Sequence, residues 1–225
     1  MKKIALFFVL SCLTIFSFML HFTVSAFEPI DYWYSTSNMI GRFTSSTISV
    51  RLYLEDDAMS SSDLATYYSF ASGEWDDLIE NDFSVITSGY PLIEFWSITR
   101  DSADSLYFPA TAVGATSVSK ATTPYARFTK LSGGTVSFYN LNYSIVMLIW
   151  DTDGTDGSVQ TSNFSAGLWE NIACHEMGHA IGHYGHSTEG MDNLMYSTTQ
   201  PYTVYGINTP QYCDWKQIWL VYSPE

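Results

Sequence analysis

The sequence predicts an α+β fold in a single domain. Residues 47–55 alternate between apolar and polar side chains, as a half-buried strand does, and residues 144–150 are almost all apolar, as in a central strand. Two further segments are interpreted as helices, one over 64–78 from its helical spacing and one over 162–181. Strands and helices mixed along a chain of 225 residues suit one α+β domain with its own core.

The first 26 residues resemble a secretory signal peptide. Lys2 and Lys3 form a basic start, residues 4–24 are almost wholly apolar, and the small residues at 24–26 fit a cleavage site. We therefore expect residues 27–225 to be one secreted, extracellular domain that is not bound to a membrane after cleavage. One alternative is an uncleaved N-terminal membrane anchor, because an apolar run of this length can span a bilayer. A less favoured one is lipid attachment at Cys12, which a long apolar stretch follows. We favour cleavage.

The chain is strongly acidic, with 23 acidic against 9 basic side chains and a net charge of −14. A nucleic-acid partner is disfavoured, because nothing supplies the basic patch that phosphates require. The acidic balance favours solubility, and we expect a monomer.

The first half of this domain begins with an irregular lead-in, residues 27–46. The strand over 47–55 comes next, and a serine-rich cap at residues 60–62 precedes the first helix. Residues 92–99 form a second strand candidate, and 125–140 look like two short strands joined by a turn at Gly133-Gly134. The apolar side of the helix is formed by Leu64, Tyr68, Ala71, Trp75 and Leu78.

The second half continues from the buried strand 144–150 into an acidic loop, D-T-D-G-T-D-G-S. Asp151, Asp153 and Asp156 could bind Ca²⁺, but the spacing is not that of an EF-hand, and we favour a solvated turn. A helix then begins near residues 162–165 and runs to Ile181, where Gly182 ends it.

All four histidines of residues 27–225 lie within twelve positions, in the stretch C-H-E-M-G-H-A-I-G-H-Y-G-H. His175 and His179 are four residues apart on the predicted helix, so both rings project from one face and can bind one cation. Glu176 is placed beside them, as in the H-E-x-x-H pattern, where the glutamate takes a proton from metal-activated water. The pattern predicts a catalytic Zn²⁺ site with Glu176 as the base.

The stretch resembles the metzincin zinc proteases, whose signature is H-E-x-x-H-x-x-G-x-x-H followed by a methionine turn. His175, Glu176, His179 and Gly182 match the first four fixed positions, but the last one falls on Gly185. We expect a loop one residue longer, with His186 as the third ligand. His183 is the alternative ligand; otherwise we expect it at the surface or supporting a ligand.

The segment N-L-M-Y-S at 193–197 is similar to the methionine turn, which implies that Met195 packs beneath the metal site without being a ligand. Tyr196 follows at once, as in bacterial matrixin-like (matrix metalloprotease-like) domains, so we expect no tyrosine ligand. A last helix is predicted from Thr209-Pro210. The resemblance implies a zincin-like domain with a twisted mixed sheet of about five strands, an antiparallel edge strand, an active-site helix and a C-terminal helix.

Cys174 and Cys213 are the cysteines of residues 27–225. In an exported chain they could pair, and two buried thiols are an equal alternative. The resemblance implies that the helices carrying them pack together, as a disulfide would require.

The function implied by the resemblance is that of a secreted zinc-dependent endopeptidase. The substrate would be an extended polypeptide lying along an edge strand near Thr135–Asn140, and residues Thr198–Asn208 would form a wall of the adjoining pocket. The alternative is a catalytically inactive zinc-binding or adhesion module of the same fold. Glu176 argues against that alternative, because metal storage does not require a base there.

Overall fold

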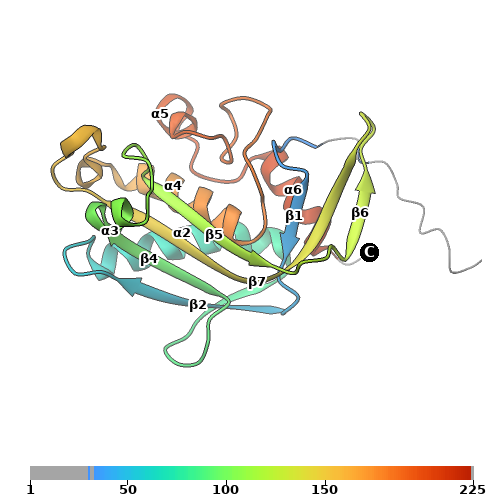
Figure 1. Cartoon of the computed structure of the whole chain (residues 1–225), viewed down its shortest axis with the longest axis horizontal. Coiled ribbons are helices and arrows are strands. Elements are labelled where there is room, and N and C mark those ends of the chain that lie inside the picture. Colours follow the sequence, from blue (N-terminus) through green and yellow to red (C-terminus); the bar gives the residue numbers. More distant parts are fainter. Residues whose placement is uncertain (1–29, 31–32, 224–225) are drawn as a thin grey trace, which may run out of the picture.

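The computed structural model describes residue 30 and residues 33–223 and contains a seven-stranded mixed sheet with helices on both faces (Figure 1). The predicted α+β class is confirmed, with more strands than the five expected. The proposed signal peptide, residues 1–26, lies outside the described residues. Within the described part of the chain, no helix combines the length and apolar character needed to cross a membrane.

The sheet is mostly parallel. Its main path runs β1-β7-β4-β2-β3, with every neighbouring pair parallel, and β5 and β6 are antiparallel partners of β7. The strands are β1 (Met39–Arg42), β2 (Thr47–Leu54), β3 (Asp82–Val85), β4 (Ile93–Thr99), β5 (Gly114–Lys120), β6 (Ala126–Thr129) and β7 (Thr135–Trp150).

Strand β7 corrects two predictions. It is one strand of 16 residues, whereas the sequence indicated two separate segments. Its first part, Thr135–Asn140, is not an edge, because it pairs with β1 on one side and β6 on the other. The described edge beside α4 is β5, which pairs with β7 alone. Strand β1 also shows that the lead-in 27–46 is not wholly irregular.

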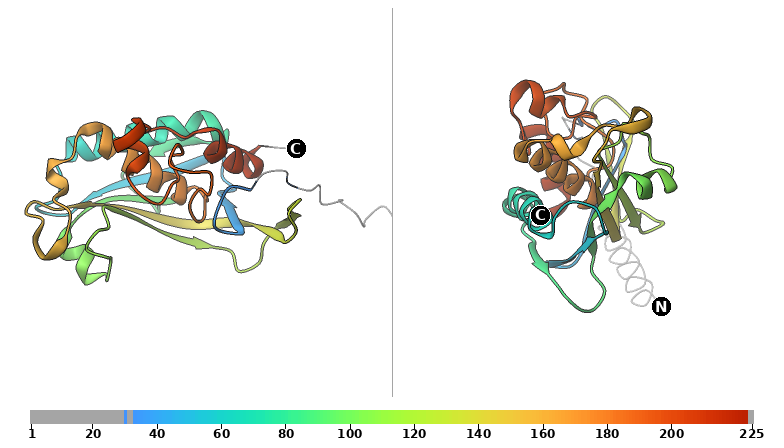
Figure 2. Two further views of the ribbon diagram at one scale, coloured as in Figure 1. Left: turned by 90° about the horizontal axis from the view of Figure 1, so that it is seen from above. Right: turned by 90° about the vertical axis from the view of Figure 1, so that its left-hand side faces the viewer.

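Helices α2 (Ser61–Ile79), α4 (Ala166–Ala180) and α6 (Tyr212–Tyr222) cover one face of the sheet (Figure 2). Ser60 caps α2 by accepting from the backbone N–H of Asp63, as its serine-rich start predicts. Ser165 caps α4 in the same way. Helix α6 begins later than predicted, because Gln211 and Asp214 form its capping box and Pro210 lies outside it.

The main core lies between these helices and the sheet. Its largest fully buried side chains include Trp75 of α2, Trp169 of α4 and Phe95 of β4. On the opposite face, the short helix α3 (Arg100–Ser105) places Ala103 on a smaller cluster with Ile98, Met147 and Ile149. The short helix α5 (Gln200–Tyr205) lies near α4 and follows the predicted methionine turn. The core thus fixes α4 against both α2 and the central strands.

Candidate metal centre

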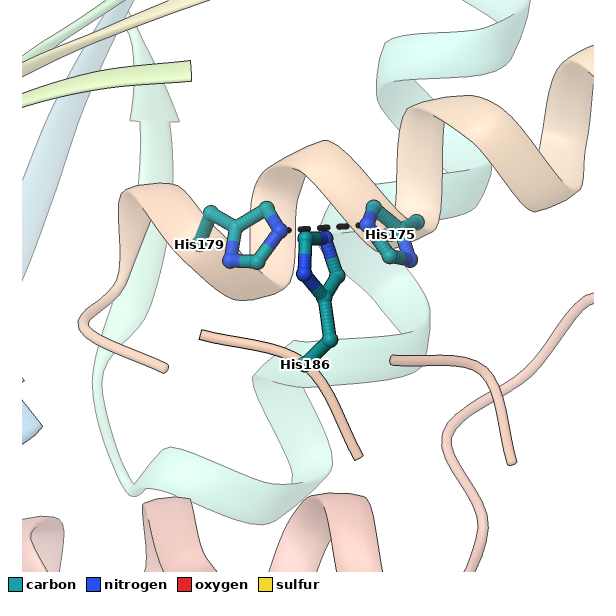
Figure 3. A group of neighbouring side chains, drawn as sticks. All are labelled: His175, His179 and His186. Atoms are coloured by element: carbon teal, nitrogen blue, oxygen red, sulfur yellow. Dashed lines mark hydrogen bonds between the residues drawn. The ribbon is translucent and has the colours of Figure 1, made fainter. Parts of the chain in front are cut away.

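Helix α4 presents His175 and His179 one turn apart, and the loop after it brings His186 opposite them (Figure 3). One ligand atom from each of the three residues lies within 4.8 Å of the other two. This set was the only group of three or more potential metal ligands found among the described residues. Three ligand atoms this close together could hold one metal ion.

The hydrogen bonds of the two helical imidazoles determine which nitrogens are free. His175 donates its Nδ1–H to the carbonyl oxygen of Leu194 at 2.8 Å, and His179 donates its own to the carbonyl oxygen of His183 at 2.7 Å. The two Nε2 atoms then face each other at 3.1 Å. In neutral rings both are unprotonated, and two bare nitrogens this close repel unless a cation lies between them.

Burial keeps these rings neutral. It lowers the pKa of His175 to about 4 and that of His179 to about 4, with the neighbouring imidazoles adding to the effect. Burial also lowers the pKa of His186 below its usual range. The neutral imidazole is the form that binds a metal, so the site is in its binding form at neutral pH.

His183 lies apart from this set. It is 1% exposed, which corrects the expectation of a surface residue, and its ring centroid is 6.4 Å from that of His179. Its ring nitrogens have no hydrogen-bond partner among the described residues. His183 instead acts through its backbone, whose carbonyl oxygen orients His179.

Glu176 lies on α4 beside the histidines and is only 8% exposed. Thr116 of β5 donates its hydroxyl to the Glu176 carboxylate at 2.6 Å and also lies 3.0 Å from the Glu176 carbonyl oxygen. At Gly114, a Cβ atom would come within 2.9 Å of Glu176 Oε1. Burial raises the pKa of Glu176, while His179 and Thr116 oppose that rise. Gly114 and Thr116 of β5, which the sequence did not single out, therefore lie against the Glu176 carboxylate.

Met195 is fully buried beneath α4. A Cβ atom at Gly178 would lie 2.6 Å from the Met195 sulfur and 2.8 Å from the Trp75 ring, so only glycine fits between these side chains. Gly178 sits directly before His179 on the helix. Met195 and Trp75 therefore pack closely against the part of the helix backbone that carries the histidines.

A cavity of about 410 Å³ opens beside His175, Glu176 and His186. Of the segment Thr198–Asn208, expected to form a wall, Thr198 and Thr199 contribute to the lining. Apart from Glu176 and the histidines, the lining residues are uncharged, and the apolar ones include Val113, Val159, Phe164, Ile172 and Tyr196.

Two other sequence interpretations concern residues outside the centre. Cys174 and Cys213 are separate buried thiols, so the disulfide alternative is not the arrangement found. In the acidic loop, the Asp151 carboxylate accepts from the backbone N–H groups of Asp153 and Gly154 and from the Ser158 hydroxyl. Calcium binding by this loop stays the less favoured alternative to the solvated turn.

Comparisons with known proteins assign no family. No family model matches the chain, and no curated protein matches it. Two solved structures of myroilysin are similar at 15% sequence identity. One has a TM-score of 0.41, and the match covers 89% of this chain and 94% of that chain. The other has a TM-score of 0.33, and the match covers 63% of this chain and 43% of that chain. Likeness at this level assigns neither family nor activity.

Proposed function

We propose that this chain is a zinc-dependent endopeptidase of the metzincin type that hydrolyses peptide bonds of extended polypeptides. One observation carries the proposal: three imidazoles converge within 4.8 Å, and Glu176 lines the same cavity as His175 and His186. Three neutral histidines and one nearby carboxylate are the ligands and the base that a catalytic zinc site requires.

The roles of the residues follow from their positions. His175, His179 and His186 would hold the metal, which when bound supplies Lewis-acid chemistry that activates water and polarises the substrate carbonyl. Glu176 would take a proton from the attacking water and deliver it to the leaving nitrogen. Its burial favours this exchange, because a raised pKa makes the carboxylate a better proton acceptor.

We infer that the substrate backbone adds to the sheet along β5. This strand is the described edge beside α4, and its first residue, Gly114, lines the cavity together with Val113. An extended peptide paired with β5 would cross the site, and one of its side chains would enter the cavity. The uncharged lining favours an apolar side chain there. We also propose, from the sequence, that the protein is secreted, is a monomer and does not bind nucleic acid.

The decisive experiment compares the wild type with Glu176→Gln, with zinc content measured for both. We expect the wild type to cleave unfolded casein, a chelator to stop cleavage, and zinc to restore it. Glu176→Gln should keep its zinc and lose about 10²–10⁴-fold in kcat, the usual contribution of a general base. Glu189→Gln, which removes an exposed glutamate, is the matched control and should keep wild-type activity.

Two outcomes would contradict the proposal. A zinc-loaded wild type that cleaves neither casein nor a diverse peptide mixture would favour the inactive zinc-binding module. Full activity of Glu176→Gln would remove this residue from the mechanism.

A further inference from the structure

The loop that carries His186 is bound to a segment that precedes β1. The backbone N–H of Thr36 donates to the carbonyl oxygen of His186 at 2.9 Å. In return, the backbone N–H of His186 donates to the hydroxyl oxygen of Thr36, also at 2.9 Å. Both backbone hydrogen-bonding groups of the proposed third ligand are thus partnered by one residue, 150 positions away in the chain.

The pairing extends on both sides of this contact. Ser35 and Ser187 form an antiparallel bridge, the backbone N–H of Thr188 donates to the Tyr34 carbonyl oxygen at 2.6 Å, and the Ser35 hydroxyl donates to the Tyr184 carbonyl oxygen. Segment 34–37 and loop 184–188 therefore form a short two-stranded contact. We call residues 34–37 the clamp segment.

Gly185 shows how closely the two segments approach. Its φ is +77°, a conformation that favours glycine. A Cβ atom there would lie 2.6 Å from the Thr36 hydroxyl oxygen and 2.7 Å from the Ser37 backbone nitrogen. Gly185 is the position on which the last histidine of the metzincin signature falls. The clamp segment thus occupies the space that a side chain at 185 would need.

The three histidines differ in what holds them. His175 and His179 are fixed by the hydrogen bonds and packing of α4, whereas His186 lies on a loop without helix or strand of its own. Ordering such a loop costs conformational entropy, and a ligand that is not already ordered binds its metal more weakly. The contact with Thr36 orders the loop before a metal arrives.

We propose that the clamp segment is a positioning element of the metal centre and that Thr36 is the residue that fixes His186. This inference rests on the proposed three-histidine site. It makes zinc affinity depend on residues upstream of β1, so a cut or substitution in 34–37 would weaken the metal site without touching a ligand.

Two substitutions remove the hydrogen bonds in steps. Thr36→Val removes only the hydroxyl that accepts from the His186 N–H, whereas Thr36→Pro removes both this hydroxyl and the N–H that donates to the His186 carbonyl oxygen. Zinc affinity is measured by competition with a chromophoric chelator, and His186→Ala serves as the benchmark for loss of the third ligand. Thr36→Ser keeps the hydroxyl, and Thr135→Val removes an exposed threonine at the start of β7 as the matched control.

We expect Thr36→Val to weaken zinc binding by about 10-fold, the usual effect of removing a group that orients a ligand, and Thr36→Pro to weaken it at least as much. Thr36→Ser and Thr135→Val should stay within about twofold of the wild type. The absorption of the cobalt(II) form gives a second readout, since it reports coordination geometry. The absorption spectrum of cobalt(II)-loaded Thr36→Val should shift towards that of cobalt(II)-loaded His186→Ala. The spectrum of Thr36→Ser should match that of the wild type.

The outcomes separate this inference from the proposed function. If His186→Ala weakens zinc binding while Thr36→Val and Thr36→Pro bind zinc as the wild type does, the positioning role of the clamp segment is disproved and the metal site stands. If His186→Ala also binds zinc as the wild type does, the three-histidine site itself is wrong. Unfolding of the metal-free variants, followed by circular dichroism, shows whether weaker binding comes from the site or from loss of the fold.

Discussion

The carboxylate of Asp214 on α6 accepts a hydrogen bond from the backbone N–H of Leu194 at 2.8 Å. It also accepts from the N–H of Met195 at 3.2 Å and from that of Gln211 at 2.9 Å. The carbonyl oxygen of Leu194 in turn accepts from His175. The C-terminal helix is therefore connected, through one residue of the predicted methionine turn, to a proposed metal ligand.

The first prediction concerns this connection. Asp214 is fully buried, so Asp214→Ala leaves three backbone N–H groups without their partner. We expect the free energy of unfolding to fall by about 2–4 kcal/mol, because each buried unsatisfied donor costs about 1–3 kcal/mol and the site relaxes in part. Urea unfolding in the presence of a chelator measures the change without any contribution from zinc. Asp77→Ala removes an exposed aspartate of α2 and should change stability by less than about 0.5 kcal/mol. Equal stability of the two variants would refute the role of Asp214.

A second prediction concerns Thr116, which acts through Glu176. Thr116→Val keeps the shape of the side chain but removes the hydroxyl that donates to the Glu176 carboxylate. We expect kcat to fall by about 10-fold with KM and zinc content nearly unchanged, because substrate binding does not use this hydroxyl and one misdirected base loses part of its effect. Thr116→Ser should restore kcat.

Thr135→Val, which removes an exposed threonine hydroxyl at the start of β7, is the control for this measurement. An equal fall in kcat for Thr116→Val and Thr116→Ser would show that the effect is one of packing and not of the hydroxyl.

The third prediction separates His186 from His183 as the ligand. His186→Leu should lower zinc affinity by more than about 100-fold, which exceeds the usual cost of losing a supporting residue. His183→Leu should still bind one zinc per chain, because its ring lies outside the three-histidine set. Zinc per protein, measured by atomic absorption after dialysis, distinguishes the two. The reverse pattern would make His183 the ligand.

The sequence predicted the local parts of the site because those depend on spacing within one helix. The cap at Ser165, the end of the helix before Gly182 and the pair of histidines four residues apart all follow from helical geometry. Thr116 and Thr36 could not be found in this way. They meet their partners across 60 and 150 residues, and a threonine carries no pattern that indicates such a contact.

Strand β7 shows why the sheet was only partly predicted. Its register with β5 shifts between Ser119, which faces Tyr143, and Lys120, which faces Leu141. Such an irregularity interrupts the alternation of inward and outward side chains, so one strand resembles two in the sequence. Asp214 could have been noticed in the sequence, because it lies on the buried side of the C-terminal helix. A carboxylate buried there needs hydrogen-bond partners.

The last prediction is a pH dependence that arises outside the metal centre. Burial alone would raise the pKa of Asp151, but hydrogen bonds from Ser158, Gly154 and Asp153 outweigh it and hold the pKa below its usual range. A carboxyl with a lowered folded pKa stabilises the fold above its unfolded pKa of about 3.9, and this contribution is lost as the pH falls through the lower folded value. As the pH falls through and below the unfolded pKa of about 3.9, the wild type should therefore lose stability more steeply than Asp151→Asn, which does not titrate and is less stable at pH 6. Urea midpoints at several pH values, with chelator present throughout, give the two slopes, and Asp77→Asn should follow the wild type. Parallel slopes for the wild type and Asp151→Asn would mean that this carboxylate does not set the acid stability of the fold.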